Sequence, residues 1–366
     1  MIYLDNGATS FRKPASVLHA VNRAMQTCAN PGRGGHKAAM EAARVVYTCR
    51  ERAAALFDCQ PEQVVFTSNC THGLNIAIRT LVKPGDRVVI SGFEHNAVTR
   101  PLYGLNAQII VAGRKAFDWE DTLTQFEAAL RQGADVAVIT HASNVFGYIL
   151  PVEEMAKLCR KYRVPLIVDA AQSAGILPVK LNSLGAAFIA MPGHKGLLGP
   201  QGTGLLLCGQ EPLPLLFGGT GSQSIRQDMP EYLPDRLEAG TLNVPGIAGL
   251  GEGIAYVSRR GINSILASEQ QVCRRCIRGL KTMGMQVFAG EHQLGTVSFV
   301  PQTDCEALAQ ALSHRDIAVR AGLHCAPLAH ESAGTLDTGT VRVSFGHDAA
   351  LWQSDGFLHT LKELLK

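Results

Sequence analysis

The chain has 366 residues and a formal net charge of +3, and 46% of its residues are hydrophobic. This length exceeds that at which one hydrophobic core usually stops growing, so we expect two domains. The basic residues are dispersed rather than gathered into a stripe, which argues against nucleic acid as the main ligand. No run approaches the roughly 20 apolar residues of a membrane-spanning helix, and no secretory segment precedes Asp5. We therefore expect a soluble, cytoplasmic protein without membrane partners.

Short apolar runs alternate with helical patterns over the first two thirds of the chain. This alternation is typical of an α/β fold with a largely parallel sheet covered by helices. The predicted strands are residues 64–67, 87–91, 136–140, 165–169, 187–190 and 204–207, and the clearest helices are residues 38–57, 119–132 and 152–162. Ligands of such sheets bind beyond the carboxyl ends of the strands, where the polar residues of this chain fall.

The pattern changes after about residue 244. A long helical segment, residues 246–283, precedes short strands at 295–300, 318–320 and 341–345 and a C-terminal helix. We predict a large domain of residues 1–244 and a small α+β domain of residues 245–366.

The ten cysteines are scattered through predicted core elements, which favours thiols over a disulfide framework. Cys273 and Cys276 form the only Cys-x-x-Cys pair, without a second pair or paired histidines. We therefore expect no metal site there.

The segment from Asp169 to Lys195 carries the strongest chemical signal. Asp169 ends a buried strand, and Lys195 follows the next one in the sequence Pro-Gly-His-Lys-Gly. A lysine can form an imine with the aldehyde of pyridoxal phosphate, and a buried carboxylate can keep the pyridine nitrogen protonated. Either residue alone is weak evidence, because an Asp after an apolar run often only caps a helix. Together they predict a pyridoxal phosphate site.

Polar residues at three other strand ends could complete this site. Thr71 and His72 open a helix, where free N–H groups and the helix dipole favour a phosphate, although an ordinary helix cap is about equally plausible. His95 could stack on a pyridine ring, while a lone loop histidine is more often a surface residue. Asn144 could donate to the ring hydroxyl or to a substrate carboxylate, and Gln172 could reach the ring hydroxyl.

A second chemical centre lies in the predicted small domain. Cys325 is flanked by His324 and lies near Arg320 on a loop marked by glycine and proline. This setting favours an exposed thiolate, so Cys325 is the candidate nucleophile. Its alternative is a buried structural thiol.

Arg342 lies within an apolar strand, where a guanidinium is costly unless an anion meets it. A bidentate clamp on a substrate carboxylate would satisfy it. An internal salt bridge is equally plausible from this fragment.

Taken together, these motifs resemble the cysteine desulfurases of the class V aminotransferase superfamily, with the type I pyridoxal phosphate fold. The resemblance begins at residues 3–9, continues through residues 30–36, the turn at Thr71, and residues 169–172 and 194–195, and extends to residues 238–243 and the cysteine loop. The short Arg-x-Gly-x-His-Cys loop is similar to the branch that includes selenocysteine lyases and the desulfurases of stress-related iron–sulfur assembly.

The resemblance implies a role for each candidate residue. It assigns ring stacking to His95, the ring nitrogen to Asp169, the ring oxygen to Gln172, the imine to Lys195 and the phosphate to His194. It also assigns sulfur attack to Cys325 and carboxylate binding to Arg342, and it implies a homodimer in which Thr241 reaches the phosphate of the neighbouring subunit. The expected substrate is L-cysteine or L-selenocysteine, and the expected sulfur acceptor is a protein or small thiol.

Two departures from the family pattern stand out. Pro192 replaces a serine that commonly binds phosphate, and Leu323 stands where many relatives carry a histidine. The competing readings are a selenocysteine lyase, another cysteine-derivative lyase or an aminotransferase. A sulfur carrier or cofactor-binding regulator without turnover is the non-enzymatic alternative.

Overall fold

A seven-stranded sheet forms the centre of the computed structural model, which describes residues 1–32 and 34–365; Arg33 of the motif at residues 30–36 lies outside them. The strand order is β2-β8-β7-β6-β5-β3-β4. Strand β8 is antiparallel to both neighbours, and the other pairs are parallel. The strands are β2 (Val64–Thr67), β3 (Arg87–Ser91), β4 (Gln108–Ala112), β5 (Val136–Thr140), β6 (Leu166–Asp169), β7 (Phe188–Pro192) and β8 (Gly204–Cys208). The expected mostly parallel α/β sheet is confirmed.

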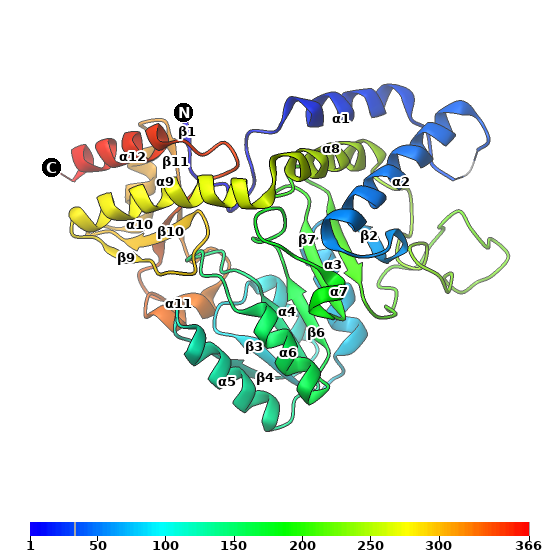
Figure 1. The fold of residues 1–366 in the computed structure, drawn as a ribbon, viewed down its shortest axis with the longest axis horizontal. Helices are drawn as coiled ribbons and strands as arrows, with labels where there is room; N and C mark the ends of the chain where they lie inside the picture. Colours follow the sequence, from blue (N-terminus) through cyan, green and yellow to red (C-terminus); the bar gives the residue numbers. More distant parts are fainter. Residues whose placement is uncertain (33, 366) are drawn as a thin grey trace.

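Helices cover both faces of this sheet, so its central strands are buried throughout and rich in Val, Ile and Leu. One apolar layer joins the sheet to α2, α5, α6 and α8, and the opposite layer joins it to α3 and α4 (Figure 1). The helices of this part are α1 (Ala15–Thr27), α2 (Lys37–Phe57), the 3-10 turn η1 (Pro61–Gln63), α3 (Cys70–Leu81), α4 (Asn96–Gly104), α5 (Trp119–Arg131), α6 (Val152–Tyr162), α7 (Leu181–Leu184) and α8 (Val244–Arg260).

A smaller α+β unit holds both ends of the chain, which lie near each other in Figure 1. Its four-stranded antiparallel sheet has the order β12-β13-β10-β9, and the N-terminal strand β1 pairs with β11. The strands are β1 (Ile2–Tyr3), β9 (Gln286–Phe288), β10 (Thr296–Val300), β11 (Ile317–Ala318), β12 (Arg320–Gly322) and β13 (Thr340–Ser344), and the helices are α9 (Ile262–Thr282), α10 (Cys305–Ser313), α11 (Pro327–Ala333) and α12 (Leu351–Leu364). The N-terminal segment thus connects the two units.

The expected single helical segment at residues 246–283 is wrong. Gly261 has a φ of +82°, which ends α8 and starts α9. Helix α8 then packs against α1 and α2 of the large unit, while α9 packs against α12. The division of the chain at residues 244 and 245 stays a prediction.

All ten cysteines are thiols, as expected, and Cys273 and Cys276 are buried in α9. Within the described residues no group of three or more His, Cys, Asp or Glu side chains could hold a metal ion. No helix in the same part of the chain has both the length and the apolar composition to cross a membrane.

Glu269 of α9 is a buried carboxyl group between the two units. Its side chain lines a small cavity together with Gln172, Lys195 and His347. Burial raises the pKa of Glu269 to about 8, Arg260 opposes the shift and Asp348 adds to it. The folded protein therefore holds a proton on Glu269 that the unfolded chain releases above about pH 4.5.

Replacing Glu269 with Gln should change the pH dependence of stability. Because the folded state binds the extra proton, the wild-type protein loses up to about 1.4 kcal/mol per pH unit from this group as pH rises from 5 to 8. The stability of Glu269→Gln relative to wild type should therefore increase over that range in urea unfolding. The same change at the exposed Glu51 of α2 is the control and should show no such trend. A relative stability of Glu269→Gln that is equal at pH 5 and pH 8 would contradict the buried, protonated state.

Candidate active site

One cavity at the carboxyl ends of the parallel strands collects most of the predicted site residues. Its walls include seven of the predicted residues: Thr71, His95, Asn144, Asp169, Gln172, His194 and Lys195. Asp169 is the last residue of β6, and the other six lie in loops or helix starts that follow β2, β3, β5, β6 and β7.

The remaining predicted residues lie outside the cavity wall. His72 lies in the first turn of α3, where its Nδ1 accepts a hydrogen bond from the Ser68 backbone N–H at 3.3 Å. Thr241 is exposed in the segment before α8 and does not line the cavity of its own chain. Arg320, Cys325 and Arg342 belong to the small unit. The sequence placed His72 correctly at a helix start, but the structure does not bring Thr241 to the other residues.

Asp169 and Lys195 are the charged residues at the base of the cavity. Asp169 is 2% exposed at the end of β6, and its Oδ1 accepts hydrogen bonds from the Ala171 backbone N–H at 2.8 Å and the Cys70 thiol at 3.4 Å. Burial is the main reason that the pKa of Lys195 is lowered; Arg342 lowers it further and Asp169 opposes the shift. A lowered pKa favours the neutral amine, which can act as a nucleophile or a base.

His95 caps the N-terminus of α4. Its Nδ1 accepts a hydrogen bond from the Ala97 backbone N–H at 3.0 Å, so in the neutral ring the proton lies on Nε2. Burial lowers the pKa of His95, against the attraction of Asp169, and favours this neutral form. The ring is therefore a flat, uncharged wall of the cavity that can donate a hydrogen bond.

Glu94, next to His95, was not predicted from the sequence. It is fully buried, and its Oε1 accepts hydrogen bonds from the Ser91 hydroxyl at 2.6 Å and the Thr140 backbone N–H at 2.9 Å. Burial raises the pKa of Glu94 to about 8. The carboxyl group thereby connects the ends of β3 and β5 beneath the cavity.

The N-terminal segment holds two residues of the cavity wall, Gln172 and His194, from outside the cavity, and local sequence patterns did not reveal it. The Gln172 amide donates to the Gly7 carbonyl at 3.0 Å, and His194 Nδ1 shares a hydrogen bond with the Thr9 hydroxyl at 3.0 Å. Lys13 Nζ donates to the His194 carbonyl at 3.0 Å, and burial lowers the pKa of Lys13 to about 8. Only the family resemblance at residues 3–9 gave a signal for this segment.

The cysteine loop reaches the cavity through Asn144. The Asn144 amide donates to the His324 carbonyl at 2.8 Å, and the Asn96 backbone N–H donates to the Cys325 carbonyl at 2.8 Å. Both loop residues have left-handed backbones, with φ of +50° at His324 and +56° at Cys325. Two successive non-glycine residues in this region are strained, so the surrounding contacts must hold the loop in place.

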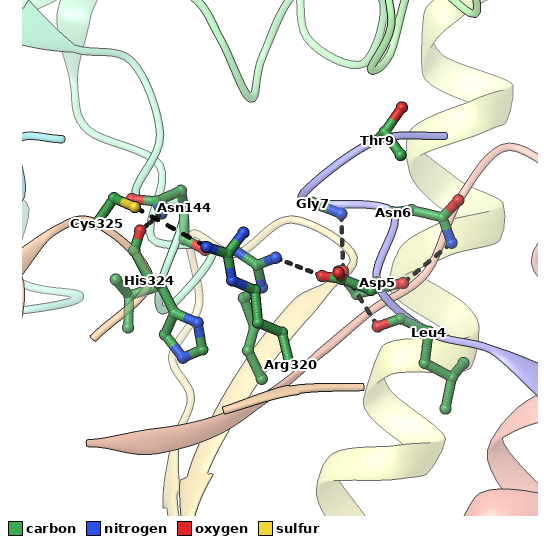
Figure 2. Close-up of polar contacts among 12 residues, drawn as sticks. Leu4, Asp5, Asn6, Gly7, Thr9, Asn144, Arg320, His324 and Cys325 are labelled. Carbon is green, nitrogen blue, oxygen red and sulfur yellow. Dashed lines mark hydrogen bonds and ion pairs between the residues drawn. The ribbon is translucent and has the colours of Figure 1, made fainter. Parts of the chain in front are cut away.

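Cys325 is exposed, and the charged group beside it is Arg320, whose Nη2 is 3.9 Å from the sulfur. The His324 ring points away from that sulfur (Figure 2) and its Nε2 lies 3.1 Å from the Thr340 hydroxyl. Burial lowers the pKa of His324 to about 2, so this ring stays neutral. The expectation that His324 helps to form a thiolate is therefore wrong, and the alternative of a buried structural thiol does not apply to Cys325.

Arg342 of β13 is fully buried and already paired. Its Nη2 donates to Asp5 Oδ1 at 2.5 Å and its Nη1 donates to the Asn144 carbonyl at 2.9 Å. Its Nε has no hydrogen-bond partner among the described residues. The internal ion pair is thus present, and binding of a substrate carboxylate stays a prediction.

The sequence is similar to that of known proteins along almost its whole length. The sequence profile of the family described as Aminotransferase class-V matches residues 2–351. The chain belongs to this family. A probable cysteine desulfurase from Pyrococcus abyssi is 32% identical over 100% of this chain and 94% of its own length, and one from Methanothermobacter thermautotrophicus is 31% identical over 94% of this chain and 89% of its own length.

A solved structure gives the same picture for this class-V chain. The apo cysteine desulfurase from Thermococcus onnurineus has a TM-score of 0.90 at 32% identity and covers 99% of this chain, which covers 94% of that protein. The Escherichia coli cysteine desulfurase CsdA, at 23% identity and a TM-score of 0.88, supports the fold alone. The expected type I fold is confirmed.

The ion pair between Asp5 and Arg342 should be important for stability. Asp5→Ala leaves a buried guanidinium without its anion, so we expect a loss of about 3 kcal/mol in the free energy of unfolding. The control is Asp355→Ala, which breaks an exposed pair with Arg275 and should cost less than about 1 kcal/mol. Urea unfolding measures both, and equal losses would show that the Asp5 pair contributes no more than a surface contact.

Proposed function

We propose that this protein is a pyridoxal-phosphate-dependent cysteine desulfurase that converts L-cysteine to L-alanine and retains the sulfur as a persulfide on Cys325. The observation that carries this proposal is the position of an exposed thiol loop, held by Asn144, at a cavity that contains Lys195, Asp169 and His95. The similar protein from Thermococcus is named a cysteine desulfurase and the one from Pyrococcus a probable cysteine desulfurase, which supports the same activity.

The residues of the cavity fit pyridoxal phosphate. The cofactor, when bound, supplies an aldehyde for an amine and a ring that accepts an electron pair. Lys195 offers the amine, Asp169 a carboxylate for the ring nitrogen, and His95 a flat ring for stacking. Gln172 would meet the ring oxygen.

The phosphate would lie at the N-terminus of α3, where the first backbone N–H groups lack helical acceptors. Thr71, His72 and His194 would complete its binding site on this chain. Pro192 has no hydroxyl to bind the phosphate. The phosphate would therefore be bound by the residues just named, by the N–H groups of α3 and by Thr241. Because Thr241 is exposed and is not among the residues that line the cavity of its own chain, we infer a homodimer in which it serves the neighbouring subunit.

The reaction needs one proton acceptor and one sulfur nucleophile. Neutral Lys195 takes the proton from the substrate Cα, and Cys325 attacks the substrate sulfur. The sulfur–carbon bond breaks and its electron pair remains with Cβ, which takes up a proton. Cα regains the proton that Lys195 holds, and alanine leaves. The sulfur is thereby oxidised to the persulfide level while the carbon is reduced, so no external oxidant is required.

The substrate carboxylate would be held by Asn144, Arg320 and Arg342. Arg320 is better placed than Arg342 to contact both the substrate carboxylate and the Cys325 thiol, because it lies beside the Cys325 sulfur. Arg342 would need to share or release its contact with Asp5.

An exposed Cys325 can pass its sulfur to an acceptor protein or a small thiol. Iron–sulfur cluster assembly as the pathway and a cytoplasmic location stay predictions.

Single-turnover chemistry tests this proposal directly. Purified protein loaded with pyridoxal phosphate should give equimolar alanine and protein-bound persulfide from L-cysteine, whereas pyruvate and ammonia would indicate elimination. Cys325→Ala should keep the cofactor absorbance but lose alanine formation roughly 100-fold or more, because the nucleophile is gone. Cys28→Ala, a change at a partly exposed thiol remote from the cavity, is the control and should retain activity.

L-selenocysteine separates the closest alternative from the proposed activity. Selenium is a better leaving group, so Cys325→Ala should lose less activity with L-selenocysteine than with L-cysteine. Full turnover of L-cysteine by Cys325→Ala would reject the assigned nucleophile, and amino transfer that depends on an added keto acid would identify an aminotransferase instead.

A further inference from the structure

Cys70 is a buried thiol in the wall of the cavity that the proposed reaction leaves without a role. It is the first residue of α3 and is 7% exposed. Its sulfur lies 3.4 Å from Asp169 Oδ1. We propose that Cys70 is a positioning residue that fixes the Asp169 carboxylate through Oδ1 and leaves Oδ2 for the cofactor nitrogen, an inference that rests on the proposed function.

Close packing of α3 against the sheet brings the thiol to Asp169. A Cβ added at Gly73 would lie only 3.2 Å from the Ala190 Cβ, so the glycine allows α3 to approach β7 closely. Ala190 is the register partner of Asp169 on the neighbouring strand. The start of α3 is therefore held against the carboxyl ends of β6 and β7, and Cys70 lies on that edge.

The two oxygens of Asp169 have different surroundings. Oδ1 accepts from the Ala171 backbone N–H at 2.8 Å and from the Cys70 thiol. No hydrogen bond to Oδ2 is found within residues 1–32 and 34–365, and Asp169 lines the cavity. Two donors from different elements thus fix the plane of the carboxylate, and Oδ2 is the oxygen available to a ligand.

A thiol suits this role because it donates weakly and stays protonated here. Burial raises the pKa of Cys70 well above its usual value, and the negative charge of Asp169 adds to this effect. A strong donor would stabilise the carboxylate and reduce the basicity of Oδ2, whereas a thiol orients the group with little such loss. Cys70 thereby combines a fixed geometry with a carboxylate that still attracts the proton of the ring nitrogen.

Variants at residue 70 test this role in the full-length protein. Cys70→Ala removes the donor and should weaken pyridoxal phosphate binding roughly 10-fold, with a changed pH dependence of the cofactor absorbance. Cys70→Ser keeps a donor, although a stronger one than a thiol, and should therefore lose less affinity than Cys70→Ala. Cys159→Ala removes a buried thiol of α6 outside the cavity and should leave cofactor affinity within about 2-fold of wild type.

Equal losses in Cys70→Ala and Cys70→Ser, or no loss in either, would overturn the proposal, because the thiol would then only fill space or have no role. A second measurement needs no cofactor. In cofactor-free protein, Asp169→Asn should speed alkylation of Cys70, mapped by mass spectrometry, because the charge that opposes thiolate formation is gone. An unchanged rate would overturn the contact even if the protein proves to be a desulfurase.

Discussion

The whole site depends on the burial of a carboxylate and an amine at the ends of two neighbouring strands. Asp169 ends β6, and Lys195 follows β7, which pairs with β6 in parallel register. Burial disfavours the charged form of the Lys195 amine, while the Asp169 carboxylate accepts hydrogen bonds from two donors. In the proposed function the two side chains would have different tasks: Lys195 would transfer a proton and attach the cofactor, and Asp169 would hold a positive group.

The segments that complete this site come from opposite ends of the chain. In the N-terminal segment Asp5 pairs with Arg342 of the small unit, and the Gly7 carbonyl accepts a hydrogen bond from Gln172 of the large unit. The segment therefore connects the two units. The cysteine loop is fixed from the other side by Asn144. These contacts hold the loop in one conformation, including the strained left-handed backbone at Cys325. A fixed loop would also keep the thiol oriented for the proposed reaction.

Much of this arrangement could be predicted from local sequence patterns. Buried strands with polar residues at their carboxyl ends predicted the sheet and six residues of the cavity, and the family resemblance added His194. Strand β4 was missed because it lies at an edge of the sheet with a partly exposed Ile-rich run, and the break at Gly261 was missed because isolated glycines are tolerated in helices. The orientation of His324 and the contact between Cys70 and Asp169 depend on residues far apart in sequence, which no local pattern reveals.

Covalent mapping of the cofactor lysine tests the central claim most directly. The protein would be loaded with pyridoxal phosphate, reduced with borohydride and digested, and the modified lysine identified by mass spectrometry. The account predicts that the label is on Lys195, because this amine is buried beside Asp169. Lys13 is the informative competitor, since it is also partly buried and contacts His194. Label on Lys13 instead, or no labelled lysine at all, would contradict the account.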